Sequence, residues 1–288
     1  MSRPPRTVMR SGRRVWFIAG LVVLATLVLV VGVLVGVRLG GRTHPSVQSA
    51  LATDFAGLES QLHAEVGIAL SAVGAGGAPI VLGHWHSGPA WSTIKVPLVI
   101  AALGEHQPPV LTDAMRAAVT ESDNVAAESI WAGLGDPATA ARKVDAVLRQ
   151  AGDPTTVQSQ RVRPEFSAFG QTKWPLTDQV RFISVAVCDR ATEPVFALMG
   201  QVTSDQSWGI GTLPDSRFKG GWGPSPSGSY VVRQMGVLTR STGMTAVALA
   251  AQPSSGKFDD GVTAVTEMAK WLAAHLSALP AGHCDYHK

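Results

Sequence analysis

The segment Trp91-Ser-Thr-Ile-Lys-Val-Pro-Leu-Val-Ile-Ala-Ala-Leu103 decides the fold and the site. Ser92 and Lys95 lie three residues apart, which on a helix places them on one face. Gly88-Pro89 precedes them, so we expect Ser92 at a helix N-terminus, where developing negative charge is favoured. The apolar residues after Lys95 predict a helix buried on all sides. Such burial would let Lys95 act as a base toward the serine hydroxyl, although an N-cap serine beside an exposed lysine gives the same pattern.

A second motif, Ser122-Asp123-Asn124, contains the only asparagine of the chain. It falls between two helix-like segments, 111–119 and 125–131, so it also fits an ordinary helix–helix turn with an N-cap. In the functional interpretation Ser122 relays a proton to a leaving group. Asn124 would hold a substrate amide and help to position Lys95.

A third motif, Lys219-Gly220-Gly221, lies just before the strand-rich C-terminal part. A cation on a strand edge can bind a substrate carboxylate and tune Ser122, whereas the alternative is a solvated lysine in a glycine turn. The order of the three motifs favours the functional interpretation.

Taken together, the motifs resemble the signatures Ser-x-x-Lys, Ser-Asp-Asn and Lys-Thr/Ser-Gly of the class A β-lactamase and penicillin-binding serine hydrolase superfamily. The resemblance covers about residues 46–278 and implies a two-lobed fold without a metal or cofactor. It implies that Ser92 is the nucleophile, Lys95 the general base and Ser122 the proton relay. The substrate-binding residues implied are Asn124, Lys219, Gly221 and Trp222. The N–H groups of Ser92 and Trp222 would form an oxyanion hole.

Three departures from the family pattern bear on activity. Gly220 stands where a hydroxyl residue is expected, which removes a charge-assisted hydrogen bond of ~1.5–3 kcal/mol. In the stretch 160–166, Arg163 aligns with the glutamate that activates water for deacylation, and Glu165 is out of register. Only 30 positions separate Ser92 from Ser122, which predicts a trimmed helical lobe and an open cleft.

The element pattern predicts an α+β fold with an antiparallel sheet flanked by helices and an inserted all-helical lobe. Helical periodicity begins the domain over 47–62 and ends it over 262–276, with strands expected at 66–73, 80–82, 230–238 and 244–250. We assign residues 46–90 and 205–288 to an α/β lobe and 91–204 to the helical lobe. The segment 153–174 lacks periodicity and is predicted to be a long loop.

The N-terminal part predicts a membrane anchor. Residues 1–14 carry five arginines and no acid, and 15–37 is a run of 23 residues without a charge. About 20 apolar residues cross a bilayer, whereas the core of a signal peptide has only about 7–15. The arginine bias places the basic tail in the cytoplasm and the domain after the 38–45 linker outside it. We therefore expect a single-pass membrane protein.

The net charge of +3 belongs to the predicted anchor. Seven of the 24 basic residues precede residue 46, which leaves 17 bases against 21 acids, a formal charge of about −4 for the domain. No nucleic-acid partner is expected, because the domain lacks the basic excess of such proteins.

Two smaller features leave alternatives open. Cys188 and Cys284 are the only cysteines, and outside the cytoplasm they could form a disulfide or remain a buried thiol and a tail thiol. His84 and His86 alternate as on one strand face, which suits either two metal ligands or, more simply, a surface strand pair. No metal site is predicted.

The sequence thus predicts a membrane-anchored, extracytoplasmic serine hydrolase that forms an acyl-enzyme. The resemblance implies β-lactams or D-alanyl peptides of peptidoglycan as substrates, with slow β-lactam turnover. The alternative is an inactive protein of the same fold that binds a cell-wall fragment or a protein partner.

Overall fold

The computed structural model describes residues 47–74 and 76–285. The predicted anchor at 15–37 lies outside the described residues. Within the described ranges, none of the helices has the length and apolar character needed to cross a bilayer.

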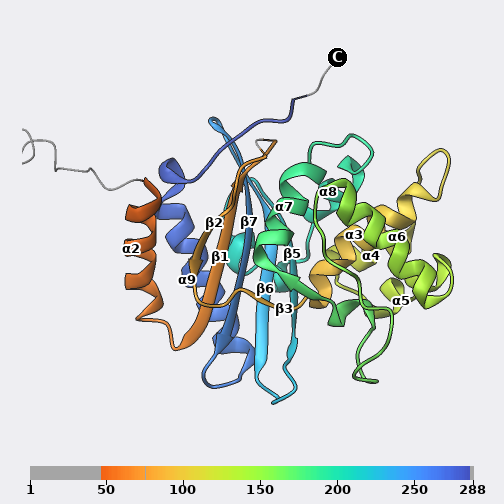
Figure 1. Ribbon diagram of the computed structural model, residues 1–288, viewed down its shortest axis with the longest axis horizontal. Coiled ribbons are helices and arrows are strands. Elements are labelled where there is room, and N and C mark those ends of the chain that lie inside the picture. The colour runs from red at the N-terminus through yellow and green to blue at the C-terminus, as the bar shows by residue number, and fades with distance from the viewer. Residues whose placement is uncertain (1–46, 75, 286–288) are drawn as a thin grey trace, which may run out of the picture. The chain divides into compact units, whose positions relative to one another are not determined.

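The described chain alternates between a sheet and groups of helices (Figure 1). The helices are α2 Val47–Glu59, α3 Lys95–Gly104, α4 Asp113–Thr120, α5 Asn124–Gly133, α6 Pro137–Gln150, α7 Leu176–Ala186, α8 Glu193–Met199 and α9 Phe258–Ala274. The strands are β1 Ala64–Ala72, β2 Ile80–Gly83, β3 Ser87–Pro89, β4 Lys173–Pro175, β5 Ser216–Pro224, β6 Tyr230–Arg240 and β7 Gly243–Pro253. Short 3₁₀ turns include η1 Trp91–Ile94 and η2 Phe169–Gln171.

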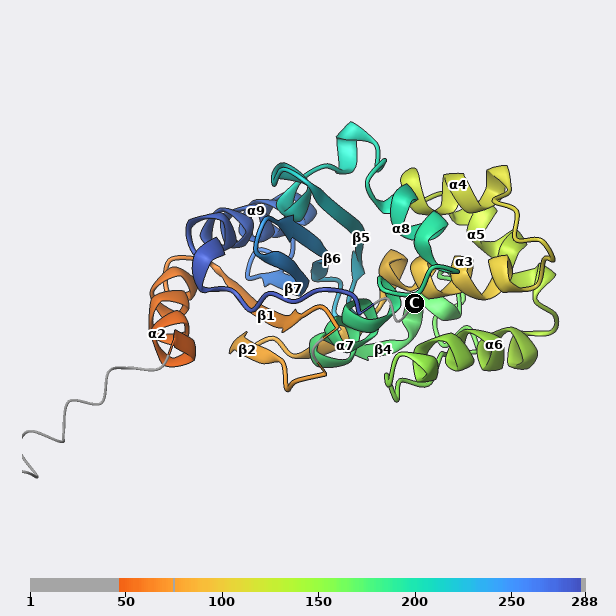
Figure 2. The same cartoon turned by 90° about the horizontal axis from the view of Figure 1, so that it is seen from above.

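A five-stranded antiparallel sheet in the order β2-β1-β7-β6-β5 forms the centre of the domain. The middle strands β1, β6 and β7 are buried almost throughout, because helices cover both faces of the sheet (Figure 2). Helices α2 and α9 pack on one face, where Phe55 meets Trp271 edge to face. The opposite face carries α7 and the remaining helices. This arrangement confirms the predicted α+β class.

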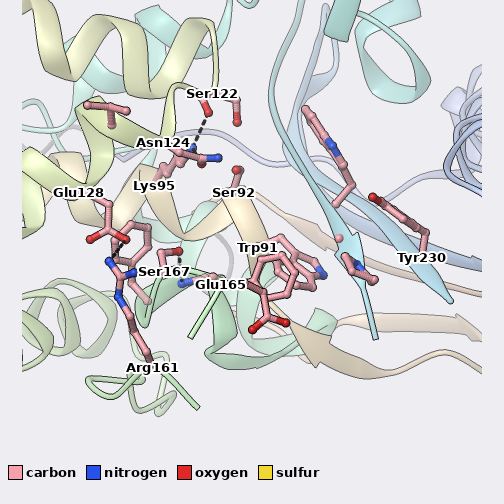
Figure 3. A pocket seen from close by; sticks show the side chains of 17 residues that line it. Trp91, Ser92, Lys95, Ser122, Asn124, Glu128, Arg161, Glu165, Ser167 and Tyr230 are labelled. Carbon is pink, nitrogen blue, oxygen red and sulfur yellow. Dashed lines mark hydrogen bonds and ion pairs between the residues drawn. The ribbon is translucent and has the colours of Figure 1, made fainter. Parts of the chain in front are cut away.

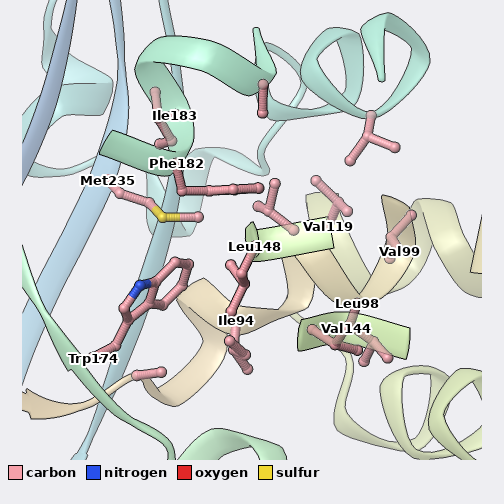
Figure 4. Packing of buried hydrophobic residues seen from close by; sticks show 14 of the residues in the cluster. Ile94, Leu98, Val99, Val119, Val144, Leu148, Trp174, Phe182, Ile183 and Met235 are labelled. Atoms are coloured by element: carbon pink, nitrogen blue, oxygen red, sulfur yellow. The ribbon is translucent and has the colours of Figure 1, made fainter. Parts of the chain in front are cut away.

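The helical region is built around α3, whose residues from Lys95 to Val99 are all buried, as the apolar run predicts. Figure 4 shows Leu98, Val144 and Leu148 packed between α3 and α6, with Phe182 of α7 close to Met235 of the sheet. Helix α7 contacts strands β1 and β7 directly. Its buried residues Val180 and Ile183 belong to one cluster with residues of both the sheet and the other helices.

Arg233 ties the sheet to the segment that leads into the predicted site. Its side chain on β6 is fully buried and donates to the carbonyl oxygens of Gly88 (3.0 Å), Pro89 (2.8 Å) and Trp174 (3.0 Å), and to the Gln179 side chain. Burial lowers the pKa of Arg233 to about 9. The guanidinium therefore holds the small β3–β4 sheet against the large one without a carboxylate partner.

The structure settles the alternatives left open for the cysteines and the histidines. Cys188, just after α7, forms a disulfide with Cys284 in the C-terminal tail. The pair His84 and His86 does not lie on a strand, because β2 ends at Gly83, whose φ of 76° turns the chain away. His84 instead pairs with Glu59 at 2.8 Å. Among the described residues no group of His, Cys, Asp and Glu could hold a metal ion.

We predict that Arg233→Ala lowers the free energy of unfolding by about 3–5 kcal/mol, because it leaves several buried acceptors without a donor. Urea unfolding followed by tryptophan fluorescence measures this loss. Arg142→Ala, at an exposed arginine on α6, is the control and should cost less than about 0.5 kcal/mol. Equal effects of the two changes would contradict the proposed role of Arg233.

Candidate active site

Ser92 lies at the N-terminus of a helical segment, as expected, in the 3₁₀ turn η1 that leads directly into α3. Trp91 just before it has φ 50°, and Ser122 has φ 59°. Bulky residues rarely adopt this left-handed region, so tertiary contacts must hold both backbones there. Within the described residues the Ser92 hydroxyl has no hydrogen-bond partner, which leaves its oxygen open to the cavity that it lines.

Lys95 begins α3 and its side chain is buried. Its Nζ donates to the Ser122 carbonyl oxygen (2.5 Å), the Asp123 carbonyl oxygen (3.3 Å) and Asn124 Oδ1 (2.7 Å). Burial lowers the pKa of Lys95 to about 8, and the nearby carboxylates of Asp123 and Glu128 oppose that shift. Since a free lysine titrates near 10.4, roughly a tenth of Lys95 is neutral at pH 7, instead of less than about 0.1%.

The second motif forms the turn between α4 and α5. The Asp123 carboxylate caps α5 by accepting from the Ala126 N–H at 2.7 Å. This cap fixes the turn in which Asn124 and the Ser122 carbonyl face Lys95, so the capping role and the site role coexist in one motif.

Lys219 on β5 completes the cluster from the sheet side. Its Nζ donates to Ser122 Oγ at 2.8 Å and to the Gly220 carbonyl at 3.0 Å. The side chain is fully buried, and burial, followed by the positive charge of Lys95, lowers the pKa of Lys219 well below its ordinary value. Lys219 thus lies behind Ser122 rather than on the cavity wall, so it contacts a ligand only through, or beside, that serine.

Gly221 permits β5 to approach the turn that carries Ser92. A Cβ atom at Gly221 would lie 2.8 Å from the Ser92 nitrogen and 2.9 Å from the Thr93 nitrogen, both backbone atoms that cannot move aside. The next residue, Trp222, lines the cavity together with Ser92. Gly221 therefore allows the backbones of Ser92 and Trp222 to come together, as the expected oxyanion hole requires.

The cavity has a volume of about 510 Å³ and is partly open to solvent (Figure 3). It brings together five of the seven predicted site residues, Ser92, Lys95, Ser122, Asn124 and Trp222, while Lys219 and Gly221 lie directly behind its wall. The other lining residues are Trp91, Val125, Glu128, Arg161, Glu165, Phe166, Ser167, Phe169, Gly170, Gly223, Pro224 and Tyr230.

Arg163 does not line the cavity but contacts three residues that do. Its Nη1 donates to the Pro224 carbonyl at 2.6 Å, two further nitrogens contact Glu165 Oε1 at 3.2 and 3.1 Å, and its guanidinium lies 4.3 Å from the Phe166 ring centre. Arg163 therefore fastens the loop to the end of β5. Although Arg163 aligns with the glutamate that activates water, it supplies no base to the cavity.

An aromatic wall flanks the third motif, and of its residues the sequence analysis named only Trp222. Trp208 and Trp222 contact each other, and both contact Phe258, which also contacts Tyr230. A Cβ atom at Gly220 would lie 3.3 Å from the Trp208 ring. A side chain at position 220 would therefore require a small shift of the Trp208 ring.

Glu128 and Arg161 are cavity residues that the sequence analysis did not single out. They form an ion pair at 2.9 Å, shown by a dashed line in Figure 3. The signal for Glu128 was present: it follows Asn124 by four residues and so faces the same side of α5. Arg161 gave no such signal, because it lies in a segment without periodicity.

Comparison with solved structures shows a β-lactamase-like fold. The chain is similar to the TLA-3 extended-spectrum β-lactamase (TM-score 0.64, 16% identity, 80% of this chain and 99% of that chain covered). It is also similar to a mutant of the class A β-lactamase of the last common ancestor of Gram-negative bacteria (0.61, 18%, 82% and 100%) and to a β-lactamase from Sphaerobacter thermophilus (0.59, 18%, 79% and 96%). No family model and no curated protein matches the sequence.

We predict that Gly221→Ala destabilises the domain by about 1–3 kcal/mol, since the new methyl group would overlap backbone atoms of η1. Gly220→Ala is the matched control, because its methyl group would meet only the edge of a tryptophan ring. Thermal unfolding of both variants checks this. A Gly221→Ala variant as stable as Gly220→Ala would mean that β5 and η1 are not held in close contact.

We also predict that Lys95 titrates with a midpoint near 8. Asp123→Asn should lower this midpoint, because it removes the carboxylate that most strongly favours the charged lysine but keeps a capping oxygen. NMR of lysine labelled with ¹³C at Cε, assigned with Lys95→Arg, measures both values. Asp259→Asn, at the start of α9, is the control and should leave the midpoint unchanged. A wild-type midpoint near 10.4 would contradict the prediction.

Proposed function

We propose that this protein is a serine hydrolase that forms an acyl-enzyme on Ser92. The observation that carries the proposal is the cluster of Ser92, Lys95 and Ser122 in one cavity, with a buried lysine of lowered pKa beside an unbonded serine hydroxyl. A neutral lysine near a free serine is the arrangement that activates a poor nucleophile.

In the proposed acylation, neutral Lys95 takes the hydroxyl proton of Ser92 as Oγ attacks a substrate carbonyl carbon. The N–H groups of Ser92 and Trp222 hold the oxyanion, helped by the close approach of β5 to η1 at Gly221. Ser122 then passes its proton to the leaving nitrogen and takes one back from protonated Lys95, so both side chains end as they began. Lys219 Nζ, which donates to Ser122 Oγ at 2.8 Å, stabilises the momentary alkoxide. The products are the Ser92 ester and a free amine.

Asn124 has a second proposed role. Its Oδ1 accepts from Lys95, so its amide nitrogen is the group left to orient toward a substrate carbonyl. The same side chain would thereby hold the base and one amide of the substrate.

The proposed substrates are β-lactams or D-alanyl peptides of peptidoglycan, from the motif resemblance and the fold. Both classes carry a carboxylate next to the reacting amide. Gly220 offers it no hydroxyl, and Trp208 fills the adjacent space. Weak binding of that carboxylate supports slow β-lactam turnover.

We further propose that residues 15–37 anchor the protein in the cell membrane with the domain on the extracytoplasmic side. The arginine bias of the first 14 residues supports this orientation. The Cys188–Cys284 disulfide also supports it, since disulfides persist in oxidising compartments.

A second candidate is a binding protein of the same fold that does not complete the reaction. Two observations favour it. Arg163 stands where the deacylating glutamate is expected and does not line the cavity. The three acceptors around Lys95 favour its charged form. Acylation of Ser92 separates the two candidates.

We predict that the domain from Thr43 onward gains the mass of an opened penicillin or of an acetyl group after incubation with benzylpenicillin or p-nitrophenyl acetate. Intact-mass spectrometry detects the adduct, and Ser92→Ala should abolish it. An adduct of equal yield in Ser92→Ala would place the reaction elsewhere. Absence of an adduct with either reagent would favour the binding protein.

The rate of acylation should rise with pH. Lys95 acts in its neutral form, so below its pKa of about 8 the rate should increase about tenfold per pH unit and then level off. Stopped-flow measurement of the p-nitrophenolate burst gives this profile. A rate that is flat between pH 6 and 9 would contradict the role of Lys95 as the base.

A further inference from the structure

We propose that Glu128 is the base that activates water for hydrolysis of the Ser92 ester. This inference rests on the proposed function and deepens it. It answers the question that Arg163 raises, namely which group could take a proton from water once the ester has formed.

Glu128 has the required position. It lies on α5 one helical turn after Asn124, whose Oδ1 accepts from Lys95 at 2.7 Å, and it lines the cavity that also holds Ser92. Its carboxylate acts electrostatically on Lys95 and raises the pKa of that lysine against the effect of burial. A water placed between Glu128 and Lys95 would therefore lie within range of the Glu128 carboxylate.

Arg161 fixes the orientation of Glu128. Its Nη2 lies 2.9 Å from Glu128 Oε1, so the guanidinium holds one carboxylate oxygen from the loop side of the cavity. The other oxygen, Oε2, has no partner within the described part of the chain. The side chain of Glu128 is 33% exposed, which gives water access to that free oxygen.

Two other carboxylates lie near the site, and their surroundings differ from those of Glu128. Glu165 also lines the cavity, but its Oε1 accepts two hydrogen bonds from Arg163 and it does not contribute to the pKa shift of Lys95. Asp123 caps α5 through Oδ1 and does not line the cavity. Of the three, Glu128 alone both lines the cavity and acts electrostatically on Lys95.

A second polar group on this wall can help to hold water. Ser167 lines the cavity, and its Oγ accepts only a long contact of 3.3 Å from the Gly170 N–H. Its hydroxyl proton remains available for donation. Figure 3 shows Ser167 in the region between Glu128 and Ser92. A water there has a carboxylate acceptor and a hydroxyl donor, which suffices to orient it.

Hydrolysis then restores the free enzyme. Glu128 takes one proton from water as the water oxygen bonds to the ester carbonyl carbon. The tetrahedral intermediate breaks its bond to Ser92 Oγ, and Oγ receives the proton that Glu128 took from water. The products are a carboxylic acid and free Ser92, and Glu128 is a carboxylate again.

The test is Glu128→Gln, which keeps size and polarity but removes the base. We expect the p-nitrophenyl acetate burst rate to change less than about threefold, and the hydrolysis of acetyl-Ser92 to slow by about 100-fold or more. Intact mass after removal of excess reagent gives the lifetime of the acetyl-enzyme.

Two matched variants separate this role from a structural one. Glu165→Gln changes the other carboxylate of the cavity and should leave the lifetime of the acetyl-enzyme within about threefold of wild type. Arg161→Gln breaks the ion pair but keeps the base, so its effect should stay within about tenfold. If Arg161→Gln slows hydrolysis as much as Glu128→Gln, the ion pair matters and Glu128 is not the base.

The remaining outcomes are equally decisive. A Glu128→Gln acetyl-enzyme with the wild-type lifetime overturns this inference and leaves the proposed function standing. A wild-type protein that forms no adduct with p-nitrophenyl acetate or benzylpenicillin overturns the proposed function and this inference together.

Discussion

Two buried lysines, Lys95 and Lys219, lie where the helical region meets the sheet, and the geometry of the site depends on how their charges are accommodated. Neither forms an ion pair with a carboxylate in the described structure; carbonyl oxygens, an amide oxygen and a serine hydroxyl surround them. An ammonium group in such surroundings costs free energy unless each N–H finds an acceptor. The turn at Ser122 supplies acceptors to both lysines. If this turn moved, both buried side chains would lose a hydrogen-bond acceptor.

Arg233 is a further buried cation whose hydrogen-bond acceptors are neutral groups rather than a carboxylate. Its guanidinium binds Gln179, whose amide donates to Thr93 Oγ1, and Thr93 in turn donates to the Ala90 carbonyl. This chain of contacts starts in the middle of the sheet and ends beside Ser92. It explains how Trp91 is kept in the left-handed region, since the backbone on either side of it is anchored by buried polar contacts.

Local features of the site could be predicted from the sequence because they depend on spacing along one helix or one turn. The burial of Lys95 follows from the apolar run after it, and the cap at Asp123 follows from the turn between two helices. Contacts between distant segments were predictable only where the motif resemblance supplied them, as for Ser122 and Lys219, which are 97 residues apart. The ion pair between Glu128 and Arg161 was missed because Arg161 lies in an aperiodic loop, although Glu128 shares a helix face with Asn124. The strand expected at His84 and His86 was wrong because a single glycine ends β2.

The buried cations also affect how the cavity interacts with a charged ligand. The domain beyond residue 46 carries a formal charge of about −4, yet Lys95, Lys219 and Arg233 concentrate positive charge beneath the floor of its cleft. Field lines from charges enclosed by a low-dielectric wall emerge through the opening of a cavity. An anion would therefore be repelled weakly at long range and attracted once inside. This polarity suits an oxygen that becomes negative only while bound, and it disfavours capture of anions from a distance.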